Sequence, residues 1–175
     1  MKVGDLIPEL TSNFNAYYEG NCLGGVSNEM DLPELESDTD EIRGAGLMGG
    51  WNAPAVGQFG PTAFTLPFIH IYEPEFKLMD TRRLHTITLR ASVQYLDPVN
   101  DIVKNRQVVV ILKGRVTKAA LGKMAVAAKG ETELEFDLTY CEVRLAGATM
   151  LKMNKIGSEY VIDGEDIYSE IRGQI

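Results

Sequence analysis

Side chains that could do metal chemistry are few in this chain and lie far apart. The two cysteines, Cys22 and Cys141, form no C-x-x-C spacing, and the two histidines, His70 and His85, are distant from both. A structural zinc site needs about four ligands at a suitable spacing. We therefore expect no metal ion and no other cofactor, and we expect both thiols to stay reduced.

The histidines are poorly placed for acid–base catalysis. His85 alternates in phase with Ile87 and Leu89, and His70 lies between Ile69 and Ile71. This pattern predicts histidines within or beside an apolar core. An active site needs a poised acid, base or nucleophile, and neither sequence context indicates one.

Three carboxylates could form an acid–base pair, because Glu133, Glu135 and Asp137 alternate along one predicted strand, about 7 Å apart. No basic or apolar partner is placed to separate their pKa values, so a solvated strand face is the better interpretation. The glycines of 44–50 match neither a phosphate-binding loop nor a dinucleotide fingerprint. The sequence therefore predicts a protein that is not an enzyme.

Long strands are the elements that position these residues. The clearest covers 84–95, where the polar side chains alternate with apolar ones: Thr86, Thr88, Arg90, Ser92 and Gln94. Two further strands are predicted over 107–118 and 132–145. In the last strand the apolar phase changes after Tyr140, as a β-bulge would cause.

The remaining chain predicts shorter elements. We expect an N-terminal arm over 1–12 and a single β-rich domain over 13–175. Within that domain we expect a strand over 62–72, a short helix over 74–80 with Pro74 at its first position, and a loop or short helix over 121–131. Residues 164–171 predict a last helical turn or two, with Asp163 as N-cap.

The charge of the chain argues against a protein that binds nucleic acid tightly. Its 175 residues carry a net charge of −8, and Lys and Arg form no cluster. Nucleic-acid binding depends on clustered cations that neutralise phosphates. No apolar run approaches the roughly 20 residues needed to cross a bilayer, and the N-terminus does not resemble a signal peptide. We expect synthesis in the cytoplasm.

A glycine-rich segment over 44–61 is the most unusual part of the sequence. Six glycines lie between Gly44 and Gly60, with apolar side chains among them. Disordered segments avoid Trp and Phe, so this predicted loop should fold against something. Trp51 and Phe59 could cover the core of their own subunit or insert into a neighbouring one.

The residues 32–50, LPELESDTDEIRGAGLMGG, resemble the LPxL…RGAGM segment of major tail tube proteins from contractile-tailed phages. Four other blocks resemble that family in the family's order. They are the NFNAYYEG block at 13–20, ILKGRVTK at 111–118, LTYCEVRL at 138–145 and VIDGEDIYSEI at 161–171.

The resemblance implies a mainly β fold: a two-sheet β-sandwich or barrel-like tube protein with a short α-helix, a long glycine-rich loop and an N-terminal arm. Hexameric rings would stack into the hollow inner tube of a contractile tail. The implied partners are other copies of the chain, the tail sheath outside, the baseplate and tail terminator at the ends, and the tape measure protein and DNA in the lumen. The implied location is the virion tail, assembled in the host cytoplasm.

Two sets of residues follow as assembly candidates. The inter-ring candidates lie in or beside the glycine-rich segment: Arg43, Leu47, Met48, Trp51 and Phe59. The candidates for lining the lumen are the polar strand faces: Thr86, Thr88, Arg90, Ser92, Gln94, Glu133, Glu135 and Asp137. We expect this lining to be acidic, so that it repels phosphate.

Two other classes of function remain open. A tube protein of a DNA-free phage-tail-like bacteriocin, or of a type VI secretion or related injection system, would share the fold. A small-molecule β-barrel binder or enzyme would need an apolar interior within one chain and would be a monomer.

Overall fold

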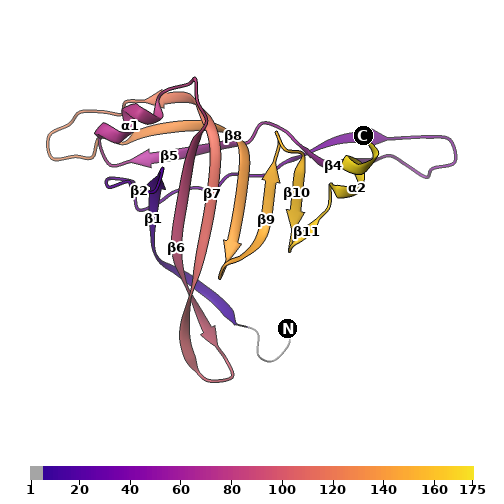
Figure 1. Cartoon of the computed structure of the whole chain (residues 1–175), viewed down its shortest axis with the longest axis horizontal. Coiled ribbons are helices and arrows are strands. Elements are labelled where there is room, and N and C mark those ends of the chain that lie inside the picture. The colour runs from indigo at the N-terminus through magenta and orange to yellow at the C-terminus, as the bar shows by residue number, and fades with distance from the viewer. Residues whose placement is uncertain (1–5) are drawn as a thin grey trace.

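Antiparallel strands make up most of residues 6–175, the part of the chain that the computed structural model describes (Figure 1). The elements in chain order are β1 (Ile7–Tyr18), β2 (Asn21–Cys22), β3 (Ser37–Ile42), β4 (Trp51–Phe59), β5 (Ala63–Phe68), α1 (Glu73–Leu78), β6 (His85–Asp97), β7 (Ile102–Ala120), β8 (Thr132–Leu145), β9 (Ala148–Asn154), β10 (Glu159–Ile162), β11 (Glu165–Asp166) and α2 (Ser169–Gln174). The predicted mainly β class is confirmed.

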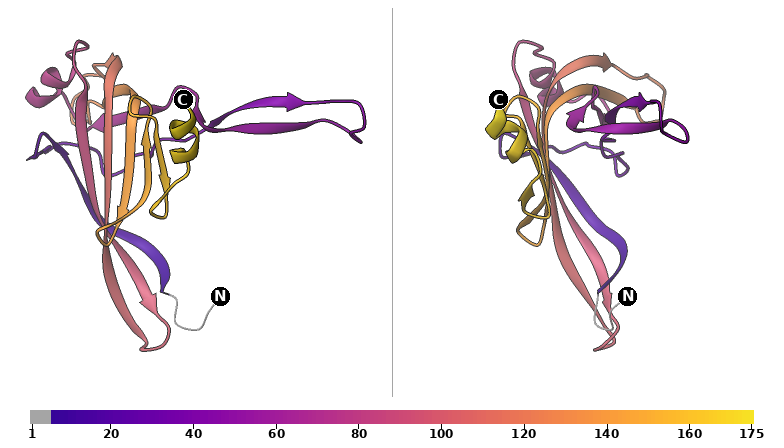
Figure 2. Two further views of the ribbon diagram at one scale, coloured as in Figure 1. Left: turned by 45° about the vertical axis from the view of Figure 1, so that its right-hand side comes forward. Right: turned by 90° about the vertical axis from the view of Figure 1, so that its right-hand side faces the viewer.

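Nine strands form one large sheet, in the order β11-β10-β9-β8-β7-β6-β1-β2, with β5 added beside β8. Strand β8 divides the sheet, because its first half pairs with β5 and its second half with β9. Figure 2 shows that the upper part of the sheet curves over, away from the lower strands. The second sheet is the two-stranded hairpin of β3 and β4.

A β-bulge at Thr139 marks the point where β8 changes partner. Lys113 of β7 lies opposite Tyr140, whereas Gly114 lies opposite Leu138, so Thr139 is the extra residue. The buried phase then moves from Leu138 to Cys141. The predicted change of phase is confirmed, although Tyr140 already lies on the polar side rather than with the core.

The core lies between the curved halves of the large sheet, with one contribution from α1. Its largest fully buried apolar side chains come from β5 to β9 and α1: Phe64, Leu66, Phe68, Leu78, Ile87, Leu112, Leu134, Phe136, Leu138 and Met153. His85 is buried among them, as expected, but His70 is exposed. The prediction for His70 was therefore wrong, because the chain leaves β5 at Phe68 and its alternation ends there.

Half of the segment predicted as a loop over 44–61 is a strand, β4. β4 pairs with β3 from Ile42–Trp51 at the tip to Ser37–Phe59 at the base, and only 43–50 form the connecting loop. Figures 1 and 2 show this hairpin projecting far from the large sheet. Gly57 of β4 has a φ of +69°, a conformation that favours glycine.

A second projection is formed by the far ends of β6 and β7 together with the start of β1 (Figure 1). Ile7 of β1 lies opposite Leu96 and Thr11 opposite Val93, with register shifts after Pro8 and after Thr11. Residues 7–12 of the predicted arm are thus part of a strand. Residues 1–5 of that arm lie outside the described residues.

The two helices are short. The predicted short helix is present, but it begins at Glu73, so Pro74 is its second residue rather than its first. The backbone N–H of Tyr72 donates to Glu75 Oε2 at 3.3 Å. The C-terminal helix starts at Ser169, so the predicted N-cap Asp163 is wrong. Asp163 and Gly164 instead form a turn with φ values of +50° and +83°. Neither helix of residues 6–175 is long and apolar enough to span a membrane.

Candidate assembly surfaces

The side of the large sheet that faces away from the core forms a continuous surface, here called the polar face. Residues opposite each other in neighbouring strands point to the same side, and Thr88, Ile111 and Glu142 are such a set. By this register the polar face includes the five predicted residues of β6: Thr86, Thr88, Arg90, Ser92 and Gln94. It also includes side chains of β7, β8 and β9: Lys113, Arg115, Tyr140, Glu142, Arg144, Thr149 and Lys152.

The three predicted carboxylates of β8 occupy a different part of this side of the sheet. Asp137 lies opposite Arg115, and Glu135 lies opposite Lys118 with 3.8 Å between Oε2 and Nζ. Strand β6 begins at His85, opposite Gly114, so it does not extend beside this half of β7. Glu133, Glu135 and Asp137 therefore lie on the curved part, beyond the row from Thr86 to Gln94.

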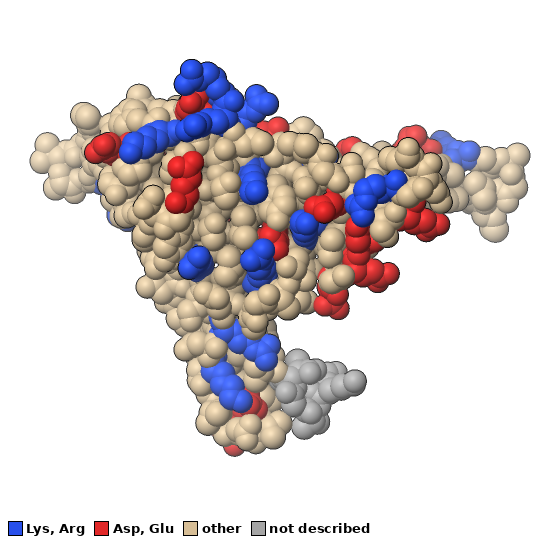
Figure 3. Space-filling view, viewed as in Figure 1, with Lys and Arg blue, Asp and Glu red and all other residues tan. Residues whose placement is uncertain are grey.

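The polar face is mixed in charge rather than acidic. Figure 3 shows basic and acidic side chains interspersed over these strands. Two of the cations lie over aromatic rings at 5.0 Å from the ring centroid, Arg90 over Tyr17 and Lys113 over Tyr140. Such cation–π contacts fix the direction of a charged side chain. The lining expected from the sequence was acidic although it included Arg90, and the basic residues that β7, β8 and β9 add to this face were not anticipated.

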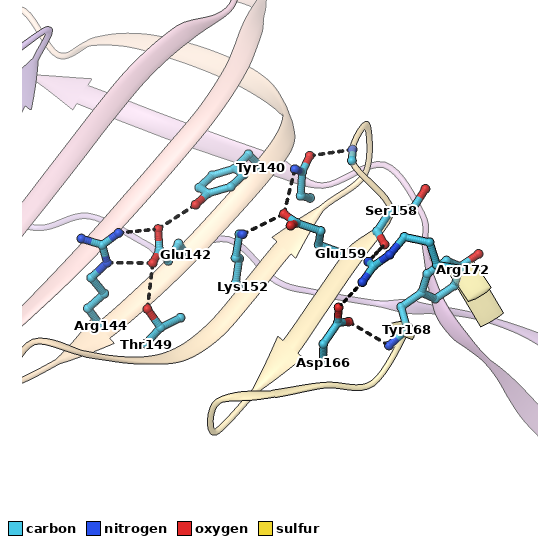
Figure 4. A network of polar contacts seen from close by, with 12 residues as sticks. Tyr140, Glu142, Arg144, Thr149, Lys152, Ser158, Glu159, Asp166, Tyr168 and Arg172 are labelled. Carbon is cyan, nitrogen blue, oxygen red and sulfur yellow. Dashed lines mark hydrogen bonds and ion pairs between the residues drawn. The ribbon is translucent and has the colours of Figure 1, made fainter. Parts of the chain in front are cut away.

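A buried carboxylate, Glu142, organises the centre of the polar face (Figure 4). It accepts hydrogen bonds from Arg144 Nε at 2.7 Å, Tyr140 Oη at 2.6 Å and Thr149 Oγ1 at 2.9 Å. Burial alone would raise the pKa of Glu142, but these hydrogen bonds outweigh it and lower the pKa to about 2. Burial and the hydrogen bond to Glu142 together raise the pKa of Tyr140.

Similar polar contacts continue toward the C-terminus (Figure 4). Glu159 of β10 pairs with Lys152 of β9 at 2.7 Å. Arg172 of α2 pairs with Asp166 of β11 at 2.5 Å and donates to the carbonyl oxygen of Ser158. These contacts hold the short last elements against the sheet. Sequence reasoning missed them, since each residue alone resembles an ordinary surface charge.

The predicted inter-ring residues fall into two groups. Arg43, Leu47, Met48 and Trp51 are exposed at or next to the hairpin tip, and Met48 is fully exposed. Arg43 pairs there with Glu41 at 2.6 Å. Phe59 lies at the base of the hairpin instead and packs against the core. The centroid of its ring is 4.9 Å from the centroid of the Tyr160 ring. For Phe59 the structure thus favours the intramolecular alternative.

Among the described residues, one buried side-chain oxygen, Glu75 Oε1, has no hydrogen-bond partner, whereas the buried His85 has two. Tyr18 Oη lies 3.1 Å from His85 Nδ1, and His85 Nε2 lies 2.8 Å from the carbonyl oxygen of Asp80. Since that carbonyl can only accept, Nε2 carries the proton and Tyr18 donates to Nδ1. Among residues 6–175, no group of three or more His, Cys, Asp or Glu side chains could hold a metal ion.

Comparison with known proteins identifies a family for this chain. A search of curated proteins gave no match. The family described as phage tail tube protein FII matches residues 8–175, which is nearly the whole chain. The chain therefore belongs to the phage tail tube protein FII family and is a structural tail tube protein.

Proposed function

We propose that six copies of this chain close into a ring, and that such rings stack into the hollow inner tube of a contractile phage tail. DNA would leave the virion through this tube during ejection. The single observation that carries the proposal is the shape of the subunit: a large open sheet with a polar face, and a hairpin that projects away from it (Figure 2).

The edges of the sheet support ring formation. Strand β1 pairs with β2 only at Tyr17 and Tyr18, so within the described chain one side of 7–15 carries no partner strand. At the other end of the sheet, β11 is only two residues long. Open edges invite pairing with another chain, and closing a ring of copies removes them.

The polar face supports the role of lumen lining. Thr86, Thr88, Ser92 and Gln94 offer hydroxyl and amide groups, and the charges around them are mostly held in pairs or over aromatic rings. A wall whose cations already have partners offers few sites for phosphate contacts. In this proposal the DNA slides because the lining has few available cations, with the acidic residues of β8 adding repulsion.

The projections support axial stacking. The hairpin tip and the N-terminal arm over 1–12 would contact the next ring, since the hairpin forms one projection of the subunit and residues 7–12 belong to the other. The tail sheath would surround the tube, the baseplate and tail terminator would bind its ends, and the tape measure protein and DNA would fill the lumen. Assembly would take place in the host cytoplasm.

Native mass spectrometry of the purified protein tests the ring directly. We expect a species of six times the 19.3 kDa chain mass, in equilibrium with larger multiples at higher concentration. A dominant monomer at every concentration, even after addition of preformed tube as a seed, would contradict the proposal.

A further inference from the structure

An open hollow of about 820 Å³ lies on the core side of the sheet, between β1, the segment 22–32 and the strands β6 and β7. Much of its wall is apolar and includes Phe14, Val26, Met30, Ala91 and Val108. Its size is that of a site which can bind several side chains. Surfaces of this kind are commonly covered by a partner.

The hairpin of β3 and β4 is a protrusion that could fill such a hollow. Its tip carries exposed apolar side chains from Leu47, Met48 and Trp51, and no other element of the described chain forms a sheet with it. An isolated two-stranded hairpin is marginally stable in water. A binding partner would stabilise it.

We propose that the hairpin tip of one copy, residues 43–51, docks into the hollow of a second copy. This contact rests on the proposed stacking of copies and assigns it a specific pair of surfaces. A protrusion and a hollow are different surfaces, so their contact is heterologous and can continue from copy to copy. Trp51 is the anchor, because buried aromatic side chains commonly dominate the energy of an interface.

Charge also matches the tip to the hollow. Arg43 is the only Lys or Arg between residues 3 and 76. Among residues 6–175, Glu29 is the only charged residue in the wall of the hollow. The neighbouring groove shares Glu29 and adds four more carboxylates, from Asp31, Glu34, Glu36 and Glu133. Arg43 now pairs with Glu41 in an exposed ion pair, which is worth little. It can exchange that partner for Glu29 of the second copy.

A native thiol allows a direct test. Cys22 lies in the wall of the hollow and is exposed, while Cys141 is buried. A Met48→Cys variant places a second exposed thiol at the hairpin tip. A disulfide forms only when the two Cα atoms come within about 7 Å. In assembled tubes, mild oxidation should then link Cys22 of one copy to the new thiol of the next.

The expected result is a ladder of linked chains on a non-reducing gel. Leu47→Cys provides a second tip position, and adding Cys22→Ser to Met48→Cys should abolish the ladder. Met124→Cys is the matched control, since Met124 is also highly exposed but lies on the loop between β7 and β8. That control should give no ladder.

A charge exchange tests the polar part of the contact. Arg43→Glu and Glu29→Arg should each slow tube growth at least tenfold, and the double variant should restore it. Normal tubes that give no ladder with either tip thiol would overturn the docking proposal and leave the tube intact. Chains that never assemble would contradict the proposed function and this contact together.

Discussion

The guanidinium of Arg144 donates two hydrogen bonds to the carboxylate of Glu142, two residues earlier on the same strand, at 2.7 and 3.1 Å. The side chain of Glu142 is only 5% exposed. A buried charge is tolerated only when it is paired and hydrogen-bonded, and Tyr140 and Thr149 complete the set. The hydrogen bond from Thr149 to this paired carboxylate therefore joins β9 to β8 beneath the surface that we propose as the lining.

Replacing Glu142 should destabilise the subunit in a pH-dependent way. The folded pKa of about 2 lies below the ordinary glutamate value, so the charged form stabilises the fold above about pH 4.5. This contribution, on the order of 3 kcal/mol, should be lost as the pH falls from about 4.5 through 2. Urea denaturation of Glu142→Gln at pH 7 and pH 3 measures it.

The expected result is that Glu142→Gln is less stable than wild type at pH 7 and closer to it at pH 3. Glu135→Gln is the control, because Glu135 is part of a more exposed pair with Lys118 at 3.8 Å, and exposed pairs contribute about 0–1 kcal/mol. A constant difference between wild type and Glu142→Gln at both pH values would show that the carboxylate charge is not what stabilises the fold.

The two cysteines should differ strongly in reactivity. Burial raises the pKa of Cys141 to about 11, so its thiolate is scarce at neutral pH, whereas Cys22 is exposed. A colorimetric thiol reagent at pH 8 should label one thiol per native chain and two after denaturation. Rapid labelling of native Cys22→Ser would contradict the buried position of Cys141.

Gly114→Ala should destabilise the subunit more than the same substitution at an exposed glycine. A Cβ at Gly114 would lie 2.3 Å from the backbone oxygen of Asp137, on the strand beside it. Overpacking of this kind costs about 1–3 kcal/mol. The control is Gly173→Ala, which meets nothing within 4 Å. Equal midpoints of thermal unfolding for the two variants would contradict the close approach of β7 and β8 at the bulge.

Reversing the charge of the curved part of the sheet should impair DNA passage without preventing assembly. The triple variant Glu133→Lys, Glu135→Lys and Asp137→Lys places cations where the proposed lining repels phosphate. Particles that carry it should contain normal tubes and release DNA more slowly. Wild-type rates of DNA release and unchanged infectivity would show that these residues do not line the lumen or do not affect transport.

The alternation of polar and apolar residues was sufficient to predict the central strands, because one face of each strand is buried against the core. It identified β6 and β8 closely and anticipated the bulge in β8. It missed β4, because Pro54 and Gly57 interrupt the pattern and both faces of the hairpin are exposed. A strand that is exposed on both faces leaves little trace of alternation.

The candidate surfaces were only partly predictable for a similar reason. The exposed residues at the hairpin tip were recognisable as apolar side chains among glycines. Glu142 was not, because its burial depends on the phase change at Thr139 and on partners that come from β9 as well as β8. The hollow could not be predicted either, since its wall combines β1, β6 and β7 with an irregular segment.

Negative-stain electron microscopy of the purified protein at high concentration, beside light scattering of a dilute sample, tests the central claim most directly. Our account predicts hollow rings or tubes with six-fold end views, which separate into smaller species on dilution. A monodisperse monomer that persists after addition of a baseplate or a tube seed would contradict it.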